Sequence, residues 1–444
     1  MNWAARAALC GCLLLTGAAA QKHPVGSKAS STSAYKLIAF KATGTVRYTD
    51  KEILAASGLQ MGQNAADGDF KEAVQRLGNS GLFSNVVYSY SVSSAGTKLE
   101  LQVTDSDSSK LVAAHFENFV WFTDDQLQAA IQKSVPFFKD LLPMAGNLPE
   151  HVSEALQALL SEKQLPGRVD FLREAELGKP ANAIDYRVGE ISIRIRNVEF
   201  PGASAEHAEL LKAASGRLIG AEYGRSTLAA AAKFDLLPVY LQRGYLKAVF
   251  AASEARIVPQ ASMPADAQAP AEVEVDAVVP VTPGKQYLTS EVEMKGNSAI
   301  ATNQLTPLIH LTQGEPADAV RLIRDLENVS KLYRSRGYMT VQVKPDPRFD
   351  DDKGTVQYEL RITEGDLYKM GEVEILGLDT QVKARLQEAW TLHEGQPYNA
   401  DYPRKFLEDT RNLVPRGVQW DISVHETPDA KDKTVDVEIR FKQP

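Results

Sequence analysis

A short phrase built around a glycine recurs along this chain. The copies read LGNSGLF at 77–83, YLQRGYL at 240–246, YRSRGYM at 333–339 and, in weaker form, NLVPRGV at 412–418. Each copy follows a helical pattern and precedes a strand-like alternation of polar and apolar residues. A phrase that returns at a regular period indicates a tandem array of small modules.

The spacing of the glycines sets the number of modules. Gly337 lies about 80 residues before Gly417 and about 90 after Gly244, whereas Gly81 and Gly244 are about 160 apart. A degenerate copy, QLPGRV at 164–169, divides the long interval at Gly167. The sequence therefore predicts about five modules, of which the second is the most degenerate.

The fourth module shows the order of its elements most clearly. Alternation with period two predicts strands, and apolar residues at every third or fourth position predict helices. The expected elements are a strand at 291–297, a short helix at 304–311, a helix capped by Asp318 that carries Val320, Ile323, Leu326, Val329 and Leu332, and strands at 341–344 and 356–362. Since Val356, Tyr358, Leu360 and Ile362 share one face of the last strand, two helices must cover that face of the sheet. We predict an α+β fold of β-α-α-β-β modules, each a three-stranded mixed sheet covered on one face by two helices.

The other modules fit the same order. First strands are expected at 40–44, 115–119, 198–202 and 373–377, last strands at 99–103, 272–276 and 435–441, and helices of the second module at 123–131 and 150–162. The expected module boundaries are 35–108, 109–190, 191–285, 286–366 and 367–444, with an Ala/Pro-rich insertion at 258–270 in the third module. An insertion of this composition is typical of a surface loop.

The N-terminus has the pattern of an export signal. Arg6 supplies a positive charge, residues 7–16 are apolar, and an A-x-A cleavage site precedes Gln21, so we expect a signal peptide at 1–20 and a flexible lead-in at 21–34. Both cysteines, Cys10 and Cys12, lie inside the signal, so the mature chain is expected to contain no thiol. The alternative is a lipoprotein box at 9–12 that leaves Cys12 acylated; we favour the signal peptide because a leucine run at 13–15 would otherwise follow the cleavage site.

Several local motifs carry a resemblance to a known family. First strands end in Gly or Gly-Asn, the first helix is followed by LQMG at 59–62, LTQG at 311–314 and LHEG at 392–395, and a Gly-aromatic pair precedes the second strand. With the β-α-α-β-β order, these motifs resemble POTRA domains, the polypeptide-transport-associated modules of BamA-family outer-membrane assembly factors. The resemblance implies a periplasmic array, associated with the outer membrane, that binds extended chains and partner proteins. Such proteins continue into a membrane β-barrel; because the fifth module ends near Pro444, we expect this chain to lack one.

Strand addition is the expected mode of binding. If the last strand is central, the second strand lies at the edge of the sheet with unpaired N–H and C=O groups, to which an extended guest can pair. The candidate edge residues are Val86, Tyr88, Tyr90, Val341 and Val343. The alternative is that these are ordinary sheet residues whose edges are shielded by neighbouring modules.

Composition and motifs argue against other classes of function. A formal net charge of −8, with 24% charged residues, argues against a nucleic-acid binder. The seven histidines are scattered without an H-x-x-x-H pair, and the sequence contains no G-x-S-x-G elbow or P-loop. We therefore expect no catalytic residues, no cofactor and no metal.

Two functions remain. The first is a periplasmic protein-binding scaffold or chaperone-like adaptor in outer-membrane protein assembly or transport. Its expected partners are an outer-membrane β-barrel protein or assembly lipoproteins supplied in trans, together with unfolded outer-membrane protein clients. The alternative is a secreted or surface structural protein that uses the array as a spacer and binds no client chain.

Overall fold

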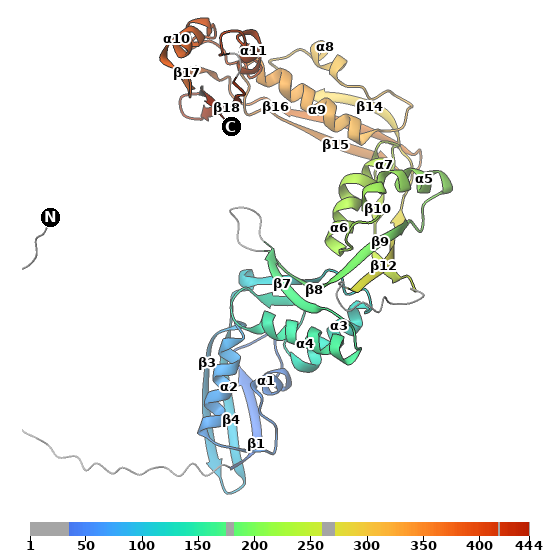
Figure 1. Cartoon of the computed structure of the whole chain (residues 1–444), viewed down its shortest axis with the longest axis vertical. Coiled ribbons are helices and arrows are strands. Elements are labelled where there is room, and N and C mark those ends of the chain that lie inside the picture. The colour runs from blue at the N-terminus through green and yellow to red at the C-terminus, as the bar shows by residue number, and fades with distance from the viewer. Residues whose placement is uncertain (1–34, 175–181, 260–270, 416–417, 444) are drawn as a thin grey trace, which may run out of the picture. The chain divides into compact units, whose positions relative to one another are not determined.

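The computed structural model describes residues 35–174, 182–259, 271–415 and 418–443 (Figure 1). The expected signal peptide at 1–20, the lead-in at 21–34, Cys12, most of the insertion at 258–270 and Gly417 lie outside these residues. We number the modules one to five by their sheets.

Module one contains a sheet in the order β2-β1-β4-β3. Its elements are β1 (Tyr35–Thr43), α1 (Asp50–Ser57), β2 (Asn64–Ala65), α2 (Asp67–Asn79), β3 (Phe83–Ser93) and β4 (Gly96–Asp105). Thr49 and Glu52 form a capping box at the start of α1, which satisfies backbone donors that would otherwise lack partners. Alternate residues of β4, Leu99, Leu101 and Val103, are buried, so one face of this sheet forms the core.

Modules two and three repeat this plan with additions. Module two has η1 (Ser108–Lys110), β5 (Leu111–Phe116), α3 (Asp124–Ser134), β6 (Leu141–Pro143), α4 (Leu148–Glu162), β7 (Arg168–Glu174) and β8 (Ala183–Gly189). Module three has β9 (Ile191–Glu199), α5 (Ala205–Ala214), η2 (Gly216–Leu218), α6 (Arg225–Ala231), the π-helical segment η3 (Ala232–Leu236), α7 (Leu237–Leu241), β10 (Val249–Phe250), β11 (Glu254–Ile257), β12 (Ala271–Val278) and β13 (Val281–Thr282). Because α6, η3 and α7 follow one another directly, they make one helical run that a π segment interrupts.

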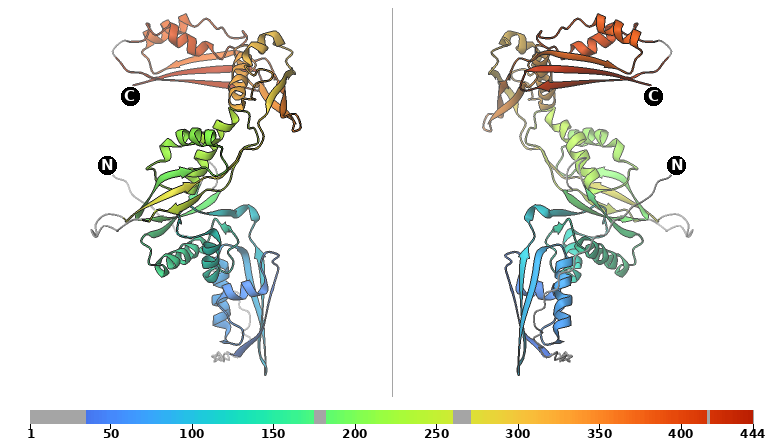
Figure 2. Two further views of the ribbon diagram at one scale, coloured as in Figure 1. Left: turned by 90° about the vertical axis from the view of Figure 1, so that its right-hand side faces the viewer. Right: turned by 90° about the vertical axis from the view of Figure 1, so that its left-hand side faces the viewer.

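Modules four and five have the simplest form. Module four has β14 (Leu288–Lys295), α8 (Thr302–Leu305), η4 (Thr306–Leu308), α9 (Ala319–Arg334), β15 (Gln342–Asp350) and β16 (Thr355–Thr363). Module five has β17 (Lys369–Leu376), α10 (Thr380–Ala389), α11 (Tyr402–Asp409), β18 (Asp421–Asp429) and β19 (Thr434–Lys442). In both modules the helices lie on one side of the three strands (Figures 1 and 2).

Apart from the two-stranded pair β10-β13 in module three, the sheets of the described residues share one topology. In each, the last strand is central and pairs in parallel with the first strand and antiparallel with the second. The central strands are β4, β8, β12, β16 and β19. The predicted mixed sheet with a central last strand is thus confirmed. The predicted apolar face of β16 is also confirmed, because Val356, Tyr358, Leu360 and Ile362 are all buried.

Four predicted details were wrong. The first strand of module two runs at 111–116 rather than 115–119, and that of module three at 191–199 rather than 198–202. The edge strand of module four continues past 344 to Asp350, through two prolines that an edge position tolerates. In α9, Ile323 is 55% exposed, because the buried face follows Leu322, Leu326, Val329 and Tyr333 at the helical period of 3.6 residues rather than every third residue.

The recurring glycine connects successive modules. Gly244 has φ 79° and Gly337 has φ 93°, a region that glycine enters at little cost. The carbonyl oxygen of Gly244 accepts a 2.8 Å hydrogen bond from the amide of Tyr287, and that of Gly337 accepts one of 2.8 Å from the amide of Tyr368. Both tyrosines stand at the start of the next module. The glycine therefore forms a backbone joint between modules three and four and between modules four and five.

Candidate functional site

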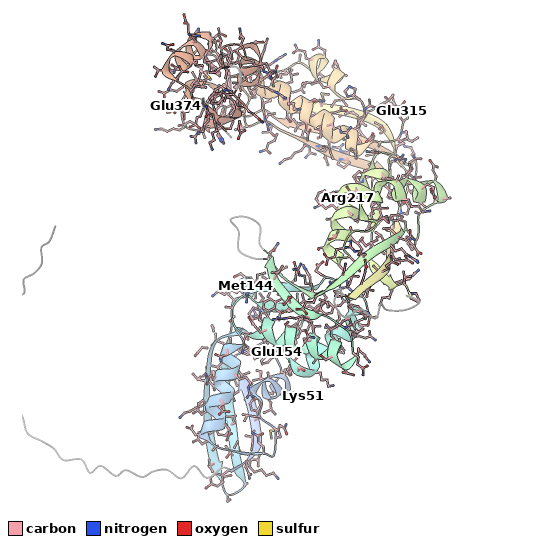
Figure 3. The ribbon with its side chains drawn as sticks, viewed as in Figure 1. Lys51, Met144, Glu154, Arg217, Glu315 and Glu374 are labelled. Atoms are coloured by element: carbon pink, nitrogen blue, oxygen red, sulfur yellow. The ribbon has the colours of Figure 1, made fainter. Side chains whose placement is uncertain are left out.

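The first strands have little free edge at their starts. In module four, Thr289 donates its amide to the carbonyl of Glu315 and accepts from the amide of Gly314, both at 2.8 Å (Glu315 is labelled in Figure 3). An isolated antiparallel bridge covers the first strand in each of modules three, four and five. The bridged pairs are Arg194 with Glu222, Leu288 with Pro316, and Lys369 with Pro397. In module one, β2 pairs with β1 in the same position. In the part of the chain that the structure describes, the second strands have a neighbouring strand on one side only and so form the edges of their sheets.

The edge strand β3 presents an uninterrupted row of backbone groups. Ser94 and Ala95 form a two-residue turn, so Ser93 and Gly96 pair as a hydrogen-bonded couple that closes the hairpin. In an antiparallel ladder the direction of the N–H groups alternates, so the amides of the even-numbered residues point away from β4. The outward row therefore contains three of the residues selected from the sequence, Val86, Tyr88 and Tyr90. β3 contains no proline, and all of these donors are present.

The side chains along this row are held by helix α2. Phe70 of α2 lies 5.0 Å from the ring of Tyr90 and 6.2 Å from that of Tyr88, measured between centroids. The hydroxyl of Tyr88 donates to Asp67 at 2.7 Å, and Lys71 pairs with the same carboxylate at 2.9 Å. Hydrogen bonds from Lys71 and Tyr88 hold the pKa of Asp67 below its usual value. The strand is fixed from one side, while Tyr90 remains 44% exposed.

The second sequence-selected edge, β15, is less complete. Val343 lies in β15 opposite Ile362, whereas Val341 is buried and precedes the strand. Pro345 and Pro347 share the parity of Val343 along the strand, and prolines occur in edge strands where the missing N–H would face outward. The outward row of β15 therefore lacks two donors, which limits pairing with a guest strand.

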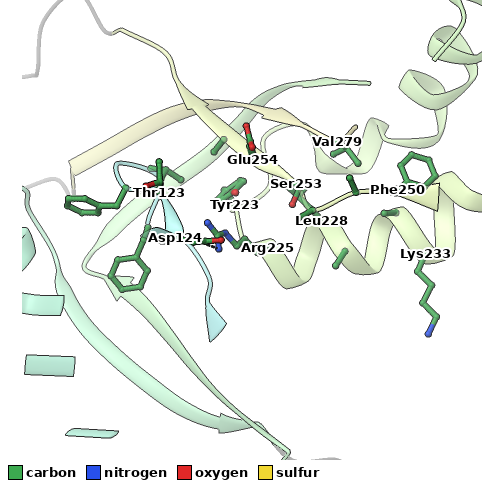
Figure 4. Close-up of a pocket in the computed structure, with 18 of the residues that line it drawn as sticks. Thr123, Asp124, Tyr223, Arg225, Leu228, Lys233, Phe250, Ser253, Glu254 and Val279 are labelled. Carbon is green, nitrogen blue, oxygen red and sulfur yellow. Dashed lines mark ion pairs between the residues drawn. The ribbon is translucent and has the colours of Figure 1, made fainter. Parts of the chain in front are cut away.

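A pocket in module three and the adjoining loop of module two was not foreseen from the sequence. It has a volume of about 800 Å³ and is lined by residues within 119–126 of module two and, in module three, by the helical run that begins at Arg225 and the segment 248–255 (Figure 4). Its walls combine aromatic residues with small ones, namely Phe119, Trp121, Phe122, Tyr223 and Phe250 with Ala229, Ala232, Ala248, Ala251, Ala252 and Ala255. The alanine-rich composition at 248–255 was the sequence signal that a space is left beside this helix.

The pocket differs from the corresponding place in module one. There, Tyr88 and Tyr90 of the second strand fill the space against Phe70 of the second helix. In module three, alanines such as Ala251 and Ala255 stand along the pocket instead, and the space remains open. Asp124 and Arg225 form an ion pair of 2.6 Å at its wall.

Neither a metal site nor a membrane-spanning helix is found within the described ranges. In those ranges no group of three or more His, Cys, Asp or Glu side chains is arranged to hold a metal ion. None of the helices described combines the length and the hydrophobicity that crossing a bilayer requires.

Comparison with known proteins relates parts of this chain to one family. Residues 287–365 match the family model POTRA, described as "Surface antigen variable number repeat". Outer membrane protein assembly factor BamA of Neisseria meningitidis serogroup B is 26% identical over 181 residues, which cover 38% of this chain and 23% of that protein. The match thus spans about a quarter of the relative's length.

Solved structures of the same kind are similar to this chain. The crystal structure of Haemophilus influenzae BamA POTRA3-5 is 17% identical to this chain, with a TM-score of 0.44. The match covers 57% of this chain and 96% of the Haemophilus influenzae chain. The crystal structure of Haemophilus influenzae BamA POTRA4 is 23% identical to this chain, with a TM-score of 0.18. That match covers 18% of this chain and 94% of the Haemophilus influenzae chain. Residues 287–365 therefore match a POTRA domain, and 38% of the chain is similar in sequence to an outer membrane protein assembly factor BamA.

Proposed function

We propose that the chain is a periplasmic protein-binding scaffold, or chaperone-like adaptor, in the assembly or transport of outer-membrane proteins. It binds extended client or partner chains by strand addition, and its role is binding rather than catalysis. The observation that carries the proposal is the proline-free outward row of β3. The similarity to an outer-membrane protein assembly factor supports the proposed process and location.

Strand addition at β3 follows from the chemistry of its edge. The outward amides and carbonyls at Val86, Tyr88 and Tyr90 need hydrogen-bond partners, and a guest backbone supplies them without regard to its sequence. Such binding suits many different unfolded outer-membrane proteins. Partners supplied in trans, including outer-membrane proteins and assembly lipoproteins, would use the same backbone chemistry. Val343 offers a second, shorter edge in module four.

A pair of variants at one position tests this edge. The probe is a synthetic peptide of alternating polar and apolar residues with a photo-crosslinker, titrated into the full chain. Tyr90→Pro removes one outward donor and the ring, whereas Tyr90→Ala removes the ring alone. Because a backbone hydrogen bond contributes about 1 kcal/mol, we expect Tyr90→Pro to bind roughly fivefold more weakly than Tyr90→Ala. Equal affinities, with both variants folded by circular dichroism, would refute strand addition at β3.

The prolines of β15 allow a test in the opposite direction. The double change Pro345→Ala and Pro347→Ala restores two outward donors to this strand. We expect cross-linking of the same peptide to β15 to increase severalfold, while cross-linking to β3 stays unchanged. No increase at β15 would show that the backbone row is not what the peptide recognises. No cross-linking to either edge in the parent chain would favour a spacer without a client.

A further inference from the structure

The junction between modules two and three contains several hydrogen bonds of Glu117. Its carboxylate atom Oε2 accepts hydrogen bonds from the amide of Ser226 at 2.9 Å and from the hydroxyl of Ser226 at 2.7 Å. Its carbonyl oxygen accepts from the amide of Arg225 at 3.0 Å, while its own amide donates to Tyr186 of β8 at 2.9 Å. Glu117 thus connects the sheet of module two to the first residues of α6 in module three.

The carboxylate of Glu117 takes the place of an N-cap side chain that α6 lacks. The first amides of an α-helix have no partner within the helix, and a side chain at the N-cap usually accepts from them. The N-cap of α6 is Gly224, which has no side chain, and no cap hydrogen bond is made from that position. A Cβ atom at Gly224 would lie 3.2 Å from Oε2 of Glu117, so the glycine leaves room for the carboxylate. Glu117 therefore caps a helix that belongs to the next module.

A second contact lies beside the first. Asp124 at the start of α3 pairs with Arg225 at 2.6 Å, with side chains 70% and 35% exposed. An ion pair this exposed contributes little by itself. Both residues line the pocket, one from each of its walls.

The junctions farther along the chain have a glycine in place of a helix cap. Modules three and four, and modules four and five, meet at backbone atoms of Gly244 and Gly337, where a side chain would disturb the contact. Lys247 of module three also pairs with Asp351 of module four at 2.8 Å. At the junction between modules two and three, a carboxylate that a single substitution can remove adds to the backbone hydrogen bond between Glu117 and Arg225. The two walls of the pocket, 119–126 and 223–255, belong to the two modules that it connects.

We propose that Glu117 is the positioning residue of this junction: by capping α6 it holds module three against module two and keeps the pocket walls together. The proposal goes beyond strand addition, because it concerns the geometry between modules and requires no client. The proposal concerns the pocket, whereas the strand addition proposed above concerns the edge of β3 in module one.

Hydrogen exchange measures the cap directly. In the full chain, Glu117→Ala should speed exchange of the amides at 225–228 roughly three- to tenfold, since hydrogen bonds to a charged acceptor are stronger than average. Glu117→Gln keeps an oxygen acceptor and should recover part of the protection. Asp125→Asn, an exposed neighbour of Asp124, is the control and should change nothing. Unchanged exchange at 225–228 in Glu117→Ala would overturn the proposal, as would an equal rise at 183–189, since that would indicate damage to module two.

A distance measurement separates an open junction from a frayed helix. The sequence contains two cysteines, Cys10 and Cys12, so with both changed to serine spin labels can be placed by Ala129→Cys on α3 and Glu209→Cys on α5. We expect a narrow distance distribution between these labels and a clearly broader one when Glu117→Ala is added. A distribution of unchanged width would mean that Glu117 caps α6 without positioning the modules, and would overturn the proposal.

Discussion

Replacing Gly244 with alanine tests whether the recurring glycine is a joint as well as the end of a helix. An ideal Cβ atom at this position would lie 2.4 Å from the carbonyl oxygen of Tyr287 and 3.0 Å from the amide nitrogen of Ala317. Both atoms belong to the backbone of module four, so neither can turn aside as a flexible side chain would. Alanine must therefore displace module four, distort the end of module three, or both.

The expected magnitude has two parts. A non-glycine residue in the left-handed region costs about 1–2 kcal/mol, and overpacking against a fixed neighbour costs about 1–3 kcal/mol more. Gly220 is a matched control in the same module, because its φ of 77° is nearly that of Gly244 at 79° but nothing lies within 4 Å of its Cβ position. We expect Gly220→Ala to lower the free energy of unfolding by about 1–2 kcal/mol and Gly244→Ala by about 2–5 kcal/mol.

Two measurements in the full chain distinguish the cost of backbone strain from the cost of contact with module four. Calorimetry reports the loss in stability, with the transitions analysed separately because a multidomain chain does not unfold in two states. Hydrogen exchange reports the joint, since the amide of Tyr287 donates to Gly244. In Gly244→Ala this amide should lose protection, and in Gly220→Ala it should keep it. If both variants lost the same stability and the Tyr287 amide stayed protected in both, Gly244 would not be a joint between modules three and four.

Two further predictions concern module four. Asp318 accepts from the amide of Arg321 at 2.8 Å as the N-cap of α9, so Asp318→Ala should cost about 1 kcal/mol in chemical denaturation, whereas Asp318→Asn should cost much less; equal losses would contradict the cap. Hydrogen bonds from Lys295 and Arg361 lower the pKa of Glu359 from 4.5 to about 2. A lowered carboxyl pKa stabilises the fold above the unfolded value, and this contribution disappears as pH falls through the folded value. The stability difference between the parent and Glu359→Gln should therefore shrink between about pH 4.5 and 2, and a difference that stays constant over this range would contradict it.

Local patterns predicted much of the fold. Alternation along 356–362 predicted the buried face of β16, because successive side chains of a strand point to opposite sides whatever lies around it. Asp318 was predicted as a cap because its oxygen reaches an amide only three residues away. Three of the five edge residues lie in the outward row of β3, since strand order and parity follow from the module plan.

Features that depend on long-range contacts were predicted poorly. The first strands of modules two and three were displaced by several residues, because their limits depend on pairing with β8 and β12 far along the chain. Ile323 was expected with the apolar face of α9, but the sheet selects which flank of the helix is buried. The pocket was missed because its walls come from segments about a hundred residues apart.

The sequence by itself determined the repeat, the β-α-α-β-β order and the positions of the glycines, because each depends on interactions within a few residues. Tertiary structure alone decided what those glycines and Glu117 do between modules. The carbonyl of Gly244 meets Tyr287 of the next module, and Glu117 caps a helix at Ser226, 109 residues away. No local period encodes such a contact, because its partners approach each other only after each module has packed its own sheet.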